Sequence, residues 1–162
     1  EIIEVGAVMV EAASLEPVAE CQSFVRPLRH PQLTDFCREL TSIAQSDVDA
    51  APPFPEVLKR FIDWAAGYAE PLFCSWGDYD RKQLQRDCAF HDLAYPRELG
   101  HLNLKTRFAE TTGIRRRLGL AEALSRSGRR FSATHHRGID DARNIARLLP
   151  QLVDPPAENR VD

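Results

Sequence analysis

The chain has 162 residues, a length that suits one domain with a sizeable core and is short for two. Its hydrophobic fraction of 43% and charged fraction of 28% are those of an ordinary soluble globular protein, and no apolar run approaches the roughly 20 residues that span a membrane. We therefore expect no membrane partner, and no signal peptide is visible. The net charge of −3 excludes a global basic field toward nucleic acid, although a site that gathers carboxylates for cations is itself acidic.

The four cysteines, at positions 21, 37, 74 and 88, are widely and irregularly spaced and contain no Cys-x-x-Cys pair. This spacing argues against a zinc site and against a disulfide framework. It predicts reduced, buried thiols in a cytoplasmic protein.

Residues 1–10 are rich in isoleucine and valine and are predicted to form a strand. Apolar side chains occupy both faces, which indicates a central, largely buried strand. Glu1 and Glu4 lie on opposite faces, so at most one of them can point into a given site. Residues 18–25 alternate well enough for the second strand of a hairpin. Because the sequence starts without Met, in what reads as the middle of an element, we expect that an N-terminal piece is absent from it.

Residues 28–53 form an irregular stretch in which we expect two short helices, near 33–40 and 43–48, with Thr34 or Ser42 as caps. The clearest helical pattern follows at 54–66, where apolar residues are spaced three and four apart. Gly67 is expected to end this helix.

A short apolar run at 72–76 is typical of a buried strand and stops at Gly77-Asp78-Tyr79-Asp80, after which we expect a helix from about 80 to 90. Acidic residues at this junction are well placed for a site, because α/β sheets bind ligands at the carboxyl ends of their strands. The alternative is that Asp78 or Asp80 only caps the next helix.

The chain continues with a strand-like piece that leads into a helix over 99–110 and with a further helix through Leu124. Two basic runs, Arg115–Arg117 and Arg129–Arg130, flank this last helix. These arginines either follow the phosphates of a nucleic acid or form a solvated surface.

His136 stands five residues before Asp141, and a helical pattern then continues to about residue 153. We expect Asp140 as the N-cap and Asp141 in the first turn. A histidine and a carboxylate at a helix start can share one site, with the carboxylate binding a metal ion and the imidazole moving a proton. The alternative is that both aspartates only cap the helix and His136 lies on the loop surface. Residues 154–162 are expected to form a frayed tail.

The order of the elements predicts an α/β protein with helices packed against a central sheet. Four segments together resemble the DEDDh family of 3′→5′ exonucleases, closest to its Eri/KapD-like branch. They are EIIEVGAV at 1–8, LTDFCRELTSIAQSDVDAAPPFPEVLKRFIDW at 33–64, SWGDYD at 75–80 and HHRGIDDARNIARLL at 135–149. The resemblance covers residues 1–153 and implies a single exonuclease domain with the RNase H-like fold, a central mixed sheet flanked by helices, whose first strand is absent here.

The resemblance also implies a site with four carboxylates, two divalent metal ions and one histidine. Matched residue by residue, Asp80 and Asp141 would be metal ligands for Mg²⁺ or Mn²⁺, and His136 would be the catalytic base. The other two ligands form an Asp-x-Glu motif on the strand before EIIEVGAV, which this sequence does not contain. Glu1 belongs to the second strand of the family pattern and does not replace that motif.

Substrate contacts are implied at Leu40, Thr41 and Ile43, which in the family lie beside the terminal nucleotide. The alternative is that Leu40 and Ile43 are core residues and Thr41 is a turn or cap residue. Tyr79 and Trp76 are candidates to stack on a base, and the alternative for both is a place in the core.

The leading hypothesis is a metal-dependent 3′→5′ exonuclease that acts on the 3′ ends of single-stranded RNA or DNA, with RNA favoured, and releases nucleoside 5′-monophosphates. A second hypothesis, favoured by the missing Asp-x-Glu, is a non-catalytic nucleic-acid-binding or regulatory protein on the same fold. A third is a different metal phosphohydrolase that uses His135, His136, Asp140 and Asp141 as a local cluster.

Overall fold

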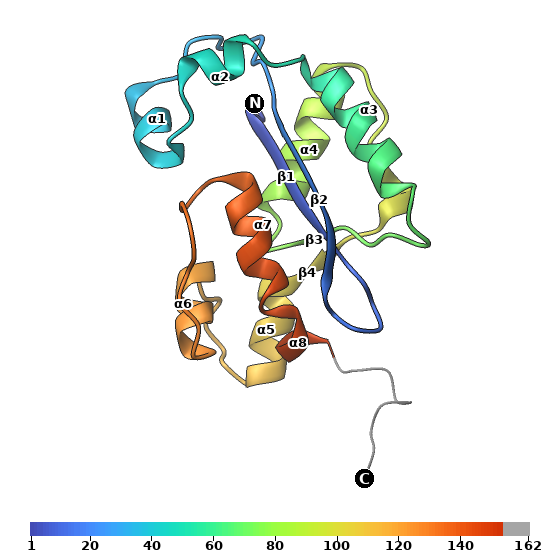
Figure 1. Cartoon of the computed structure of the whole chain (residues 1–162), viewed down its shortest axis with the longest axis vertical. Helices are drawn as coiled ribbons and strands as arrows, with labels where there is room; N and C mark the ends of the chain where they lie inside the picture. Colours follow the sequence, from blue (N-terminus) through green and yellow to red (C-terminus); the bar gives the residue numbers. More distant parts are fainter. Residues whose placement is uncertain (154–162) are drawn as a thin grey trace.

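The computed structural model describes residues 1–153, so the tail expected at 154–162 lies outside the described residues. Two strand pairs and eight α-helices make up this part of the chain (Figure 1). In chain order the elements are β1 Glu4–Val10, β2 Pro17–Phe24, α1 Asp35–Thr41, α2 Gln45–Asp49, α3 Phe54–Ala65, β3 Cys74–Ser75, α4 Tyr79–Phe90, a 3₁₀ turn Arg97–Leu99, β4 Leu102–Asn103, α5 Leu104–Thr112, α6 Leu120–Arg126, α7 Gly138–Ala146 and α8 Leu149–Leu152.

The hairpin of β1 and β2 separates two layers of helices. Its strands are antiparallel, with Glu4 opposite Phe24 and Gly6 opposite Gln22. Val5 packs into a core shared with α3 and α4, whereas the neighbouring Gly6 meets the backbone of α7. This alternation is the period of two that a strand imposes on its side chains. It places α3 and α4 on one face of the hairpin and α7 on the other.

The sheet differs from the expected one in its continuity. Within residues 1–153, β1 pairs with β2 alone, and β3 pairs with β4 alone, in parallel. The prediction that residues 1–10 form a central, largely buried strand is therefore wrong for the described part of the chain, because β1 has one neighbour and is half-buried along its length. Both antiparallel and parallel pairing are present, as a mixed sheet requires.

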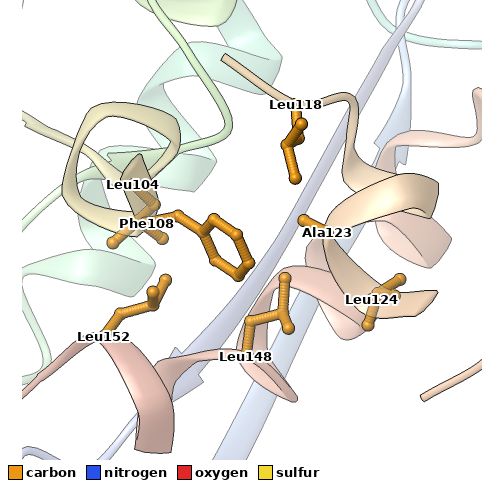
Figure 2. Close-up of a cluster of buried hydrophobic side chains, with 7 residues drawn as sticks. All are labelled: Leu104, Phe108, Leu118, Ala123, Leu124, Leu148 and Leu152. Carbon is orange, nitrogen blue, oxygen red and sulfur yellow. The ribbon is translucent and has the colours of Figure 1, made fainter. Parts of the chain in front are cut away.

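The larger of two buried clusters joins the C-terminal helices. Its members come from α5, α6, the segment before α6, and the end of the chain around α8, and they are Leu104, Phe108, Leu118, Ala123, Leu124, Leu148 and Leu152. Figure 2 shows Leu118 and Leu148 approaching the Phe108 ring from different sides. We call this group the C-terminal cluster, because all its members lie in the C-terminal part of the chain.

The helix expected to run from Asp140 to about residue 153 is two helices with an earlier start. Gly138 is already helical, so Asp140 lies inside the first turn of α7 and is not its N-cap, and the helix is interrupted between Ala146 and Leu149. Pro150 accounts for the interruption, because proline has no N–H to donate within a continuing helix and is tolerated only in a first turn.

Of the two residues predicted as helix caps, Thr34 caps the start of a short helix and Ser42 does not. The Thr34 side chain accepts a hydrogen bond from the Cys37 N–H and caps α1, as expected. Ser42 instead ends α1 in the left-handed conformation, and Ala44 precedes α2.

All four cysteines are free, in agreement with the prediction of unpaired thiols, although only Cys88 is fully buried. Desolvation raises the pKa of the Cys74 thiol to about 11, so that this thiol stays protonated at neutral pH. Among the described helices, none has the length and apolar character required to cross a bilayer.

Candidate active site

The first half of the site is the turn between β3 and α4. Asp78 precedes α4 and its carboxylate accepts a hydrogen bond of 3.0 Å from Arg81 Nη2. Asp80 lies in the first turn of α4 with an accessible carboxyl group. The protein packed around this carboxyl group desolvates it and raises its pKa, an effect only partly offset by a hydrogen bond from its own backbone N–H. The raised pKa means that a neighbouring cation would stabilise the charged form of Asp80.

The second half is the loop that leads into α7, together with the first turn of that helix. Desolvation also raises the pKa of Asp141, while the charge of His136 and a hydrogen bond from the His136 backbone N–H act in the opposite direction. His136 has a φ of +63°, in the left-handed region that few residues other than glycine adopt. Strained conformations of this kind gather at functional sites, where the surrounding contacts enforce them.

The two halves meet. The negative charge of Asp80 raises the pKa of Asp141, which means that the two carboxyl groups lie close enough to repel one another. Asp80, His136 and Asp141 are far apart in sequence but share one region of the molecule. The structure thus brings together all three residues that were predicted for metal binding and catalysis.

The C-terminal cluster fixes both halves. Trp76, just before the Asp80 turn, packs edge-to-face on Phe108 at 5.7 Å between ring centroids and donates a hydrogen bond of 3.0 Å from Nε1 to the Leu118 carbonyl. Phe131, just before the His136 loop, also packs against this cluster and stacks on His135 at 3.6 Å. A single packed core therefore sets the relative position of the two site segments.

A buried carboxylate anchors α7 from the hairpin. Glu4, whose side chain is 3% exposed, accepts hydrogen bonds from Arg137 Nε and Nη2, both at 3.1 Å, and from the Gly138 N–H at 2.7 Å. It also accepts one from Gln22 Nε2 at 3.1 Å. Glu4 was not predicted as part of the site. The signal for it in the sequence was an acidic residue two positions from Gly6 on the same face of an otherwise apolar strand.

Gly6 permits the close approach that these hydrogen bonds require. A Cβ atom at Gly6 would lie 2.1 Å from the Ile139 nitrogen and 2.3 Å from the Gly138 carbonyl carbon. Only a residue without a side chain lets the first turn of α7 lie directly on β1. The position of His136 and Asp141 therefore depends on the backbone of β1.

The donor chemistry fits hard divalent cations, but the donor number is incomplete. Carboxylate oxygens are the ligands that Mg²⁺ and Mn²⁺ prefer, and Asp80 and Asp141 supply them. Within residues 1–153 there is no group of three or more His, Cys, Asp or Glu side chains that could hold a metal ion. Asp80 and Asp141 are therefore two carboxylates of the type that such a cation prefers, and the described residues do not gather a third.

The residues predicted to contact substrate fall into two classes. Ile43 is 2% exposed, so its side chain belongs to the core and is not available to a nucleotide. The Thr41 hydroxyl donates a hydrogen bond to the Cys37 carbonyl at 2.8 Å and accepts one from the Ile43 N–H at 3.2 Å, which is the cap role given as its alternative. Leu40 and Tyr79 are 40% and 72% exposed and remain accessible.

The structure also decides two open alternatives: Trp76 takes the core place given as its alternative, and the third hypothesis, the local cluster, is not supported. Trp76 packs against the C-terminal cluster, and its edge-to-face contact and indole hydrogen bond occupy it, so it is not presented for base stacking. The local cluster of His135, His136, Asp140 and Asp141 does not form a metal site. Asp140 instead accepts hydrogen bonds from Arg143 Nη1 at 3.0 Å and from the Thr134 N–H at 3.2 Å.

Comparisons with known proteins agree with this architecture. The Exonuclease (RNase_T) family model matches residues 1–149. Human 3′-5′ exoribonuclease 1 is 33% identical over 171 residues, which cover 100% of this chain and 49% of the human protein. Mouse ERI1 exoribonuclease 2 is 33% identical over 175 residues, which cover 94% of this chain and 25% of the mouse protein. The chain thus spans about half or less of the length of these curated relatives.

Solved structures give the same answer at the level of the fold. The nuclease domain of 3′hExo, a DEDDh family member bound to rAMP, superposes with a TM-score of 0.90 at 32% identity, covering 100% of this chain and 85% of that one. A 3′-exonuclease described in 3′-end specific recognition of a histone mRNA stem-loop gives a TM-score of 0.86 at 30% identity, covering 91% and 69%. These likenesses confirm the predicted α/β class with the RNase H-like fold. The chain belongs to the Exonuclease (RNase_T) family and is similar to its DEDDh members.

Proposed function

We propose that the protein carrying this chain is a 3′→5′ exonuclease that shortens single-stranded RNA in preference to DNA and releases nucleoside 5′-monophosphates. The observation that carries the proposal is the proximity of three residues distant in sequence, since the charges of both His136 and Asp80 act on the carboxyl group of Asp141. Two relatives named exoribonucleases and the family match support it.

The choice of RNA rests on the neighbours. One similar structure is bound to rAMP, and another is described in recognition of the 3′ end of a histone mRNA stem-loop. Both ligands are ribonucleotides, and discrimination from DNA depends on contacts to the 2′-hydroxyl. We propose that Leu40 and Tyr79, which are exposed, contact the terminal nucleotide, and that Thr41 shapes the turn beside them.

Asp80 and Asp141 are the residues that would hold the divalent cations. Mg²⁺ or Mn²⁺ bound there would lower the pKa of a water molecule and stabilise the charge that develops on the phosphate. A cation held by these residues would also offset the negative charge of Asp80 that contributes to the raised pKa of Asp141. A bound cation would thus add to the partial compensation that His136 and the backbone hydrogen bonds already give these carboxyl groups.

His136 is the proposed general base. Neutral imidazole can accept a proton from the attacking water near neutral pH, and the Asp141 carboxylate beside it stabilises the resulting imidazolium. The hydrogen bond from the His136 backbone to Asp141 and the left-handed backbone of His136 fix the ring relative to the carboxylate. His136 then returns the proton to solvent or to the leaving oxygen.

We propose that the remaining ligands come from an Asp-x-Glu motif on a strand outside the 162 residues. Within residues 1–153, β1 and β3 each have one paired neighbour, so each keeps an edge whose N–H and C=O groups have no strand partner. Such edges accept a further strand. The residues encoded upstream of Glu1 in the intact gene test this directly, because an Asp-x-Glu ahead of a short loop completes the ligand set.

The second candidate function is a non-catalytic nucleic-acid-binding or regulatory protein. The observation that favours it is the absence, within residues 1–153, of a group of three metal-binding side chains. If the intact protein has no Asp-x-Glu, this function replaces the enzyme.

We also propose a cytoplasmic location, supported by the four free cysteines, which imaging of a tagged protein would test.

The decisive assay uses the full-length protein with Mg²⁺ or Mn²⁺ and 5′-labelled single-stranded RNA and DNA of equal sequence. A ladder of shortened, still labelled products establishes 3′→5′ direction, and a faster ladder on RNA establishes the sugar preference. Analysis of the released product identifies the nucleoside 5′-monophosphate. The Asp80→Asn protein is the control for contaminating nucleases, and no ladder from the parent with either metal ion would overturn the proposal.

A further inference from the structure

Four arginines on either side of α6 have no role in the contacts described so far. Arg115, Arg117 and Arg130 are exposed and Arg129 is half-buried, and within residues 1–153 none of the four guanidinium groups has an ion-pair or hydrogen-bond partner. We call these four side chains the arginine surface. Their neighbours Arg116 and Arg126 differ, because both pair with Glu122.

Local charge sets this region apart from the rest of the molecule. Residues 115–130 contain six arginines and one acidic residue, Glu122, whereas the whole chain has a net charge of −3. Because Glu122 is already engaged by two arginines, the excess positive charge is concentrated on the other four. Unpaired guanidinium groups at this density favour an anionic partner.

The first arginine pair is anchored beside the Asp80 turn. Arg115 and Arg117 come directly before Leu118, which is 2% exposed and points into the C-terminal cluster (Figure 2). The Leu118 carbonyl accepts the indole hydrogen bond of Trp76, four residues before Asp80. The segment that carries this pair is therefore hydrogen-bonded to the residue that follows β3, four residues before Asp80.

The second pair is anchored beside the His136 loop. The Arg130 carbonyl accepts a hydrogen bond of 3.0 Å from Arg147 Nη1 of the segment after α7. Two residues later, the Ser132 N–H and carbonyl are bound by the Asn144 side chain at 3.0 and 2.8 Å. Phe131, between them, packs against the C-terminal cluster.

Each arginine pair is thus followed by a residue that packs in the core that also positions the site. Leu118 follows the first pair and Phe131 follows the second, and both contact the C-terminal cluster. On one side, Leu118 of this cluster is hydrogen-bonded to Trp76, which precedes Asp80 by four residues. On the other side, Phe131 stacks on His135, the neighbour of His136. The segments that carry the four arginines are consequently packed on the same core as the two site segments.

We propose that Arg115, Arg117, Arg129 and Arg130 bind the phosphates of the single strand upstream of the nucleotide at the Asp80–Asp141 site. The inference rests on the proposed function, since it names the path of that same substrate. Guanidinium groups match phosphate oxygens in geometry and charge, and they read no base. The arginine surface therefore supplies affinity that is independent of sequence and grows with the length of the strand.

The test measures binding separately from turnover. Fluorescence anisotropy with 5′-fluorescein oligouridylates of 2 to 12 nucleotides, in EDTA, gives the Kd of the full-length protein and of Arg115→Gln/Arg117→Gln and Arg129→Gln/Arg130→Gln. The matched control is Lys59→Gln/Arg60→Gln, which removes the same charge from α3, where Asp63 and Glu56 pair with these residues. Circular dichroism verifies that each variant is folded.

We expect each arginine variant to raise the Kd for the 12-mer roughly tenfold at low salt, with a smaller effect on the 2-mer and no change in the control. The slope of log Kd against log salt should fall by about 0.7 for each phosphate that the variant no longer binds. Replacing the four arginines by lysine should restore most of the affinity. Equal loss in the control, or equal Kd values for parent and variants, would overturn the proposal.

The ladder assay on the same proteins separates the two proposals. A parent that produces no ladder but whose arginine variants still lose length-dependent binding refutes the exonuclease and keeps the arginine surface. A parent that produces a ladder, with variants that bind and degrade the 12-mer equally well, keeps the exonuclease and refutes the arginine surface.

Discussion

Glu4 caps a helix that begins 134 residues later in the chain, through a hydrogen bond of 2.7 Å from the Gly138 N–H to its carboxylate. The N-terminus of α7 has no side-chain cap of its own. A negative charge at this end also complements the helix dipole. The strand thereby holds the helix that carries Asp141, and Arg137 completes the arrangement with two further hydrogen bonds to the same carboxylate.

Glu4→Gln keeps the shape of the side chain and removes its charge. We expect the free energy of unfolding to fall by about 1–3 kcal/mol, because Arg137 loses its ionic partner in a buried setting. Turnover should fall more than KM rises, since the substrate contacts stay in place. Urea unfolding and steady-state kinetics measure both effects. Gln22→Ala, which removes another partner of the same carboxylate, is the control, and a Glu4→Gln protein equal to that control contradicts the anchoring role.

Gly6→Ala tests the contact between β1 and α7. The added methyl would lie 2.1 Å from a backbone nitrogen, so the helix must move, and we expect a destabilisation of about 2–3 kcal/mol together with loss of activity. The matched control is Gly119→Ala, where a Cβ atom meets nothing within 4 Å and the cost should stay below about 1 kcal/mol. Thermal unfolding of the two variants checks the contrast, and similar melting temperatures would refute the tight contact.

His136→Ala and His135→Ala separate two adjacent histidines. We expect His136→Ala to keep the fold and lower turnover by roughly 10²–10⁴-fold, because the proposed base is removed. His135 stacks on Phe131, so His135→Ala should lower the melting temperature and affect turnover less. Turnover and thermal unfolding are measured on both proteins. Unchanged turnover of His136→Ala would exclude His136 as the base.

The stability of the fold should fall on acidification because of His101. Its ring nitrogen Nε2 lies 2.8 Å from Ser75 Oγ, and desolvation, aided by the charge of Arg81, lowers its pKa below 6.5. The folded protein then binds fewer protons than the unfolded chain just below pH 6.5, so stability present above that pH is lost as pH falls. Urea unfolding at pH 7.5 and 5.5 measures the difference.

His101→Gln should reduce this pH dependence while keeping a polar partner for Ser75. His30→Gln, at an exposed position, should leave it unchanged. If the two variants show the same dependence on pH, the effect does not come from His101.

Amphipathic periodicity predicted the helix at 54–66 well, because packing of an apolar stripe determines it. The helix expected at 54–66 is α3, Phe54–Ala65, and four of its apolar residues are buried. The strand expected at 72–76 is shorter, because β4 offers only two residues for pairing. A strand needs a partner, and the sequence of one strand does not give the length of the other.

The chemistry of the site stays a prediction, and its construction was predicted only in part. Spacing and resemblance identified Asp80, His136 and Asp141, which the structure brings together. The cap of α7 was misplaced at Asp140, because a carboxylate from a distant strand performs that function, and local capping rules consider only neighbouring residues. Ile43 was assigned to substrate because a motif gives positions but not the direction of side chains.

The dependence of both site segments on the C-terminal cluster has a consequence for how the protein loses activity. Trp76 and Phe131 contact the same buried leucines, so the Asp80 turn and the His136 loop share one support, to which the Glu4 bond adds a second for α7. When this cluster opens, both segments are released in one event, and amide hydrogens on either should exchange with the same opening free energy. Inactivation by heat would then follow a single transition. Substitutions that only loosen the leucine core would lower catalytic activity, although they touch no catalytic residue.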